Sequence, residues 1–306
     1  SDLGVYLVSK LARQHVKVVL SGEGGDELFA GYPKYVVDWL ARYYHVLPTS
    51  MRDQVVSPLL ERLPYRFRKV KMAARNLSQP APQRWLSWFG IFNGQWKDHL
   101  LSESTKASID MDSSRLFQRW LDQNPQRDDL SSMLYLDTKI WLPDNLLMKG
   151  DKMTMAASLE SRMPFLDYKL VEYAASIPSN VKTRPFKAKY LLKQAYQDFL
   201  PEPILTRKKM GFNFPTDVWF REEQRDLITR LLLSERTRSR GLLNHEFIAR
   251  IVSDHQQGKT NYGNQIFILA SLELWFRVFI DHAYLDYPQE SLEDLVEMSY
   301  PTPVSV

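Results

Sequence analysis

The stretch VKVVLSGEGGDELFAGYPKY, residues 16–35, determines how the rest of the chain is interpreted. It begins with Val16, Val18, Val19 and Leu20, a short apolar and mostly β-branched run that predicts a strand buried on both faces. A glycine-rich turn follows, and the residues after it favour a helix. The predicted order is therefore strand, tight turn and helix.

The turn carries three polar side chains, Ser21, Glu23 and Asp26, which we expect to crowd one edge of the sheet. In open α/β sheets, ligands bind outside the carboxyl ends of the strands, so this turn is a candidate site. Carboxylates beside a nucleotide would repel its phosphates, so nucleotide binding here would require Mg²⁺, with Asp26 as the better ligand candidate. A solvent-facing acidic turn that merely caps a helix explains the spacing equally well. The turn matches neither the GxGxxG fingerprint nor a P-loop.

The bulk composition is that of an ordinary globular protein. Hydrophobic residues make up 44% of the chain and charged residues 25%, and no apolar run approaches the roughly 18 residues that span a membrane. The net charge of +4, from 40 basic and 36 acidic residues, does not call for nucleic acid. A basic stretch at residues 62–75, followed by Trp85 and Trp88, is interpreted as a solvated helix face rather than a nucleic-acid or membrane surface. The absence of cysteine excludes disulfides and thiolate chemistry and is compatible with a cytoplasmic protein, which we expect.

Helical periodicity dominates the chain outside the strand. We expect an N-terminal helix, a long helix over residues 26–45, and a proline-broken helical insertion over residues 45–130. Apolar residues at 3.6-residue spacing predict further helices at residues 128–142, 145–160, 166–177, 186–200 and 262–282. Because a lone strand cannot satisfy its backbone groups, most of its sheet is expected outside these residues.

Two later stretches carry charges that a binding site would use. In residues 142–167, Asp151, Glu160 and Arg162 are interleaved with apolar residues, which predicts either buried ion pairs or charges that face a cleft. Lys189 and Lys209 belong to a basic cluster at residues 187–209, which is either solvated or directed at anions.

Four stretches resemble, in the same order, the synthetase domain of the glutamine-hydrolysing asparagine synthetases and their β-lactam synthetase relatives. They are SGEGGDELFAGYPKY (21–35), LPDNLLMKGDKMTMAASLESRMPFLD (142–167), KAKYLLKQA (187–195) and RKKMGFNFP (207–215). The resemblance implies an α/β parent fold, a parallel-sheet synthetase domain of the ATP-pyrophosphatase or adenine nucleotide alpha hydrolase-like type. These residues would form its predominantly α-helical C-terminal portion, over residues 1–287, with one clear strand. Residues 288–306 would be an acidic, poorly ordered tail.

The resemblance also implies an ATP-dependent amide ligase. Such an enzyme uses ATP and Mg²⁺ to convert the side-chain carboxylate of aspartate to β-aspartyl-AMP, with release of pyrophosphate. Ammonia, which comes from glutamine in the full-length enzyme, then attacks this intermediate to give asparagine and AMP. Glu23 and Lys209 would be catalytic, and Asp26 would hold the metal. The residues implied for ATP are Leu20, Ser21, Gly22 and Lys189, and those implied for the substrate are Asp151, Glu160 and Arg162.

Two parts of the family pattern do not occur in these 306 residues, namely a pyrophosphate loop of type SGGxDS and the N-terminal glutaminase domain with its cysteine nucleophile. We therefore expect a C-terminal piece of a longer enzyme that is inactive by itself. The strand edge at residues 16–20 would lack its neighbours, so we expect self-association, for example as a homodimer, or pairing with another chain.

Two other functions compete with this one. The nearer is a relative that amidates a different carboxylate, such as a sugar acid or a peptide. The farther is a non-catalytic binding protein on the same fold, with residues 62–75 as its contact surface. The presence of Glu23, Asp26 and Lys209 together argues against the second.

Overall fold

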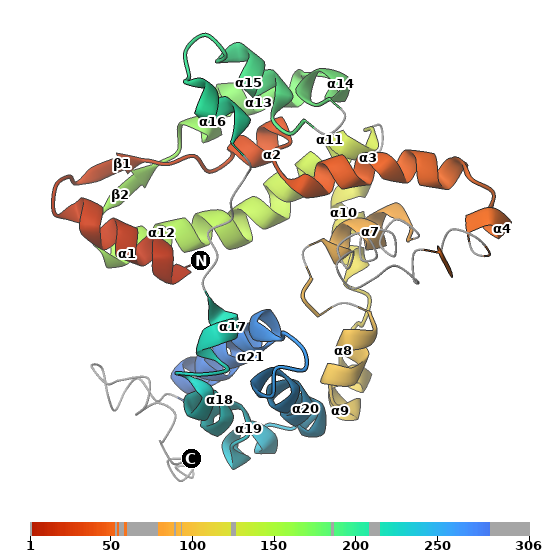
Figure 1. The fold of residues 1–306 in the computed structure, drawn as a ribbon, viewed down its shortest axis with the longest axis vertical. Helices are drawn as coiled ribbons and strands as arrows, with labels where there is room; N and C mark the ends of the chain where they lie inside the picture. The colour runs from red at the N-terminus through yellow and green to blue at the C-terminus, as the bar shows by residue number, and fades with distance from the viewer. Residues whose placement is uncertain are drawn as a thin grey trace. The chain divides into compact units, whose positions relative to one another are not determined.

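The computed structural model describes residues 2–52, 54, 58–59, 79–88, 90–92, 94–123, 127–184, 187–207 and 215–281 (Figure 1). The chain divides into two compact units. The first comprises residues 1–89 and 113–213, and the second comprises residues 90–112 and 214–306. The basic stretch at residues 62–75 and the tail at residues 288–306 lie outside the described residues.

The first unit is mainly helical, as the family resemblance implied, and contains one short parallel strand pair where a single strand was predicted. Its elements are α1 (Asp2–Arg13), β1 (Val18–Leu20), α2 (Gly25–Phe29), α3 (Pro33–Val46), α4 (Thr49–Met51), α7 (Ala81–Ser87), α10 (Ser114–Asp122), α11 (Asp129–Leu136), the π-helix η3 (Asp137–Leu147), α12 (Met148–Ala156), β2 (Glu160–Arg162), the 3₁₀-helix η4 (Pro164–Leu166), α13 (Tyr168–Ser176), α14 (Ser179–Lys182), α15 (Tyr190–Ala195) and α16 (Glu202–Thr206).

The second unit is a helical bundle around one apolar core. Its elements are α8 (Gln95–Leu100), α9 (Glu103–Ser108), α17 (Thr216–Trp219), α18 (Arg225–Leu232), α19 (Glu235–Ser239), α20 (His245–Gln256), α21 (Gly263–Trp275) and the π-helix η5 (Phe276–Ile280). Residues 263–280 are long and apolar enough to cross a membrane by length and composition. Within this unit, however, Ile266 and Leu269 of the same helix are core residues, and Arg277 is fully buried against Glu273 at 2.8 Å.

The strand predicted at residues 16–20 is present as β1, and it has a partner that the sequence pattern did not reveal. β1 pairs in parallel with β2, with Val18 opposite Glu160 and Leu20 opposite Arg162. Glu160 was expected to end a helix, but α12 ends at Ala156. A three-residue strand with charges at both ends has too few apolar residues for period-2 alternation to be recognised.

The expectation that β1 is buried on both faces is wrong for this chain. Val18 is 44% exposed and Leu20 is 73% exposed. The β-branched run fixes the strand conformation, but burial depends on what packs against each face. On the same part of the unit, α1 packs against α12 and leaves an apolar stripe in solvent, formed by Leu3, Leu7, Val8 and Leu11.

Two predicted helix boundaries also differ from those observed. The long helix expected over residues 26–45 is interrupted, because α2 ends at Phe29, Ala30 is left-handed at φ 53°, and α3 begins at Pro33. A proline lacks the N–H that a continuous helix would need, so it suits the first turn of α3. The helices expected at residues 128–142 and 145–160 instead form one helical run, because a π-helix accommodates Pro143.

The turn between β1 and α2 requires a glycine at position 24. Gly24 has φ 89°, and a Cβ there would lie 2.3 Å from Cδ2 of Leu166. At Gly22 in the same turn, by contrast, a Cβ would meet nothing within 4 Å. Of these two glycines, only Gly24 combines a left-handed backbone with surroundings that leave no space for a side chain.

We therefore expect Gly24→Ala to lower the free energy of unfolding by about 1–3 kcal/mol, because strain and overpacking act together. Gly22→Ala is the matched control and should change it by less than about 0.5 kcal/mol. Chemical denaturation of both variants measures the difference. Equal stability of the two would contradict the local geometry.

The exposed stripe on α1 predicts self-association. Exposed apolar patches of this kind favour contact with another surface, and β1 also offers a strand edge that no described strand covers. Sedimentation velocity should detect oligomers that the double change Leu7→Glu with Leu11→Glu reduces. Leu116→Glu, at a residue of α10 that is 50% exposed, is the control and should leave association unchanged. A monomer at all concentrations would refute the prediction.

Candidate functional site

The carboxyl ends of β1 and β2 meet at one edge and deliver the polar turn. The backbone N–H of Ser21 donates to the carbonyl of Arg162 at 2.9 Å, which continues the strand pairing by one residue. The chain then turns through residues 22–24 into α2. Ser21 and Glu23 are half-buried, and the Ser21 hydroxyl donates to the Glu23 carboxylate. The two side chains therefore lie together, as the sequence predicted.

Asp26 and Lys189 form the central ion pair of the site. Lys189 Nζ lies 2.9 Å from Asp26 Oδ1, with side-chain exposures of 30% and 22%. Lys189 immediately precedes α15, and Figure 1 shows α15 close to α2. Two residues predicted for different tasks, metal binding and ATP binding, are thus in direct contact.

Backbone geometry holds this pair in place. Lys189 is left-handed at φ 52°, and its N–H donates to the carbonyl of Ala30 at 3.3 Å. Gly31 provides the space, because a Cβ there would lie 1.7 Å from Asp26 Oδ1 and 2.4 Å from Lys189 Cε. The backbone before α15 and the glycine after α2 therefore both accommodate the ion pair.

Glu160 and Arg162 pair with each other in solvent. Arg162 Nε donates to Glu160 Oε1 at 2.7 Å, and their side chains are 67% and 52% exposed respectively. The sequence left two alternatives open, buried ion pairs or charges that face a cleft. The exposure of this pair rules out the first, and the second stays a prediction. The two residues are two positions apart in one strand, so their side chains lie on the same face, which is exposed.

Of the other predicted charged residues, only Asp151 lies in the described part of the chain. Asp151 is exposed in α12, and within the described part of the chain its carboxylate forms no ion pair with Arg162. Lys209 and its neighbour Lys208 lie outside the described residues.

A buried polar network behind Asp26 was not found from the sequence. Tyr32 Oη donates to Glu27 Oε1 at 2.5 Å, and Lys34 Nζ donates to Asp137 Oδ1 at 2.7 Å. The Tyr35 hydroxyl donates to the same Asp137 carboxylate. Glu27 follows Asp26 directly, but nothing in its spacing distinguishes a buried glutamate from a helix-capping one. The network links α2, α3 and η3, so it supports the turn from behind.

Burial raises the pKa of Glu27, and the hydrogen bond from Tyr32 opposes that shift. Burial likewise raises the pKa of Asp137, opposed by the charge of Lys34. Because the folded-state pKa of Glu27 exceeds its value of 4.5 in the unfolded chain, its contribution to stability is complete below pH 4.5. The contribution is lost as the pH rises through the folded-state pKa.

Replacing Glu27 by Gln keeps the shape and removes the titration. The stability of Glu27→Gln relative to the parent should therefore increase as the pH rises above 4.5. Denaturant unfolding at a series of pH values measures this difference. Tyr32→Phe, with Glu27 kept, removes the hydrogen bond that opposes the rise in pKa. The free energy of unfolding should then depend more steeply on pH than in the parent. A difference that is constant with pH would disprove the assignment.

Comparison with known proteins places this geometry in a family. The family model described as asparagine synthase matches residues 1–277. Asparagine synthetase [glutamine-hydrolyzing] 1 of Bacillus subtilis (strain 168) is 29% identical over 286 residues, covering 94% of this chain and 44% of the relative. A putative asparagine synthetase [glutamine-hydrolyzing] of Mycobacterium tuberculosis (strain ATCC 25618 / H37Rv) is 29% identical over 284 residues, 91% of this chain and 42% of the relative.

A more distant relative carries a different name. Amidase chyE of Penicillium rubens is 24% identical over 265 residues, 78% of this chain and 38% of the relative. The chain thus spans less than half the length of the curated relatives it matches. Since the family model covers residues 1–277, which include the strand pair, the polar turn and Lys189, the chain belongs to the asparagine synthase family.

Proposed function

We propose that these residues form part of the active site of an ATP-dependent amide ligase that adenylates the side-chain carboxylate of aspartate and transfers ammonia to it. The observation that carries the proposal is the Asp26–Lys189 pair at 2.9 Å, beside a turn at the carboxyl ends of two parallel strands. In such sheets this edge is where nucleotides bind. Family membership supports a ligase of this class.

The residues fit an ATP site. The backbone of Leu20 and Gly22 and the hydroxyl of Ser21 would line the nucleotide, and the space around Gly22 is open to an approaching ligand. Lys189 would hold pyrophosphate oxygens, because a leaving group with several negative charges requires fixed cations. Lys209, outside the described residues, is proposed to stabilise charge at the reacting centre.

Asp26 fits a Mg²⁺ site of the kind completed by phosphate. Among the described residues no three His, Cys, Asp or Glu side chains gather around one point, so Asp26 would be one carboxylate ligand among phosphate oxygens and water. Bound Mg²⁺ would neutralise the phosphates. Without Mg²⁺ and phosphate, Lys189 balances the charge of the Asp26 carboxylate. A magnesium–triphosphate complex would supply a cation to Asp26 and an anion to Lys189.

Glu23 is proposed to guide or deprotonate the incoming ammonium. Its carboxylate is half-buried at the end of the strand edge and already accepts a hydrogen bond from Ser21, so it can accept a proton without leaving its position. Arg162 would hold a substrate carboxylate bidentately, which requires its bond to Glu160 to open. Asp151 is the third proposed substrate contact.

We further propose that the chain works within a longer cytoplasmic polypeptide that supplies the pyrophosphate loop and the glutaminase. The relatives, of which this chain spans less than half, support this arrangement. A second acceptor carboxylate is the alternative, favoured by the amidase name of one relative and by the solvent exposure of Arg162. A panel of carboxylic acids, assayed for AMP release in the longer protein, separates the two, because only aspartate should be adenylated under the main proposal.

Glu23→Gln, made in that longer protein, should separate the two half-reactions. We expect asparagine formation to fall by about 10²-fold or more, because the general base is lost while the shape is kept. Aspartate-dependent exchange between ATP and pyrophosphate should stay within about threefold of the parent, since no adenylation contact is removed.

Glu172→Gln, at an exposed residue of α13, is the control and should leave both rates unchanged. Unchanged asparagine formation in Glu23→Gln would remove Glu23 from the mechanism. Equal loss of both half-reactions would make Glu23 a structural or nucleotide-binding residue instead.

A further inference from the structure

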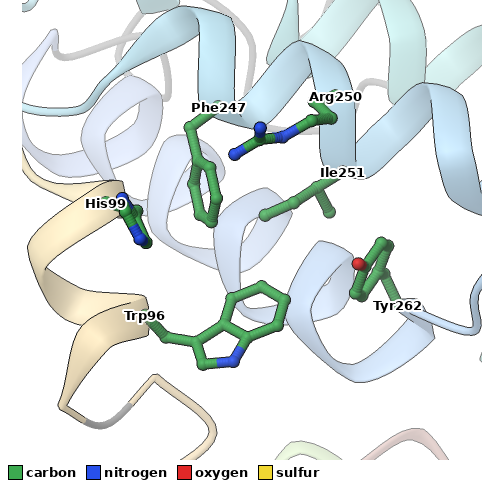
Figure 2. Close-up of a pocket in the computed structure, with 6 residues that line it drawn as sticks. All are labelled: Trp96, His99, Phe247, Arg250, Ile251 and Tyr262. Carbon is green, nitrogen blue, oxygen red and sulfur yellow. The ribbon is translucent and has the colours of Figure 1, made fainter.

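The second unit contains an aromatic pocket with a volume of about 210 Å³ (Figure 2). None of its residues is used by the proposed ligase chemistry, and all of them lie in residues 90–112 and 214–306. The lining comes from α8, α20 and the residue before α21, namely Trp96, His99, Phe247, Arg250, Ile251 and Tyr262.

The aromatic walls are fixed by packing and hydrogen bonds. The Trp96 ring meets Phe247 at 5.7 Å and Tyr262 at 5.5 Å between centroids, both edge-on. Phe247 is anchored because its N–H donates to the Asn244 side chain at 3.1 Å. The N–H of Tyr262 donates to Nδ1 of the fully buried His255 at 3.0 Å. The aromatic wall of the pocket is therefore preformed.

The polar groups at its edge favour an anion. The Arg250 guanidinium lies 5.0 Å from the centroid of the Phe247 ring, and Figure 2 shows it directed over that ring. Within the described part of the chain, Arg250 forms no ion pair, and the lining contains no carboxylate. If the aromatic rings held a cation, that cation would lie against the positive charge of Arg250. The arginine therefore favours an anionic ligand.

The volume restricts the size of the ligand. About 210 Å³ is below the roughly 300–1,000 Å³ usual for drug-sized ligands. One aromatic ring with a short acidic side chain fits this volume. A planar ring can stack or meet edges with Trp96, Phe247 and Tyr262 in the arrangements that aromatic pairs prefer.

We propose that this pocket binds a small planar aromatic carboxylate, with the ring against the aromatic wall formed by Trp96, Phe247 and Tyr262 and the carboxylate on Arg250. Guanidinium donors match a carboxylate bidentately. The site is additional to the ligase reaction and does not depend on it.

The test uses residues 1–306 and ligand-observed NMR titration with phenylacetate. We expect saturable binding with a Kd of about 1 mM or tighter. Benzylamine keeps the ring and reverses the charge, and cyclohexylacetate keeps the charge and removes the aromatic ring. Both should bind at least about tenfold more weakly than phenylacetate.

Arg250→Gln should weaken phenylacetate about tenfold or more, because an exposed arginine that contributes one charged contact is lost without disturbing the core. Arg225→Gln, at an exposed residue of α18 outside the pocket, is the matched control and should leave the Kd unchanged. Circular dichroism checks that both variants fold. Absence of saturation, equal affinity for benzylamine, or full affinity in Arg250→Gln would each overturn the proposal.

Discussion

The ion pair between Asp26 and Lys189 is the interaction on which the candidate site depends. It joins the turn after β1 to the segment before α15, and the space at Gly31 exists for it. A partly exposed ion pair contributes only about 0–1 kcal/mol to stability. The left-handed backbone of a non-glycine residue such as Lys189 costs about 1–3 kcal/mol. Because the cost is at least as large as the gain, stability does not explain the arrangement, whereas the proposed exchange of partners with magnesium and phosphate would.

The network behind the turn has the opposite character. Glu27, Tyr32, Tyr35 and Asp137 are largely removed from water and hydrogen-bonded to one another or to Lys34. Buried charges with satisfied partners resist rearrangement, because breaking a pair leaves an uncompensated charge. The turn thus combines a rigid base with a pair of partly exposed charges that can change partners, which suits the proposed binding of a nucleotide and release of its products.

Part of this organisation can be predicted from the sequence because it is local. The β-branched residues at 16–20 specify a strand, the glycines specify the turn, and the spacing of Ser21 and Glu23 brings their side chains together. The break in the predicted helix at residues 26–45 could also have been read from Gly31 and Pro33. Long-range features could not be predicted from the sequence. The pairing of β1 with β2, the contact of Asp26 with Lys189, and the exposure of Leu20 and Arg162 depend on segments distant in sequence, about which local pattern carries no information.

The proposed role of Lys189 is to bind phosphate rather than to stabilise the fold, and Lys193 provides a matched comparison. Lys193 lies one turn further along α15 and donates to the carbonyl of Leu205 at 2.5 Å. The Kd for ATP with Mg²⁺ should be measured by calorimetry for Lys189→Met and Lys193→Met, each made in the longer polypeptide proposed above. If Lys189 binds phosphate, Lys189→Met should weaken ATP binding about tenfold or more, and Lys193→Met should change it by less than about threefold. Equal affinities in the two folded variants would contradict it.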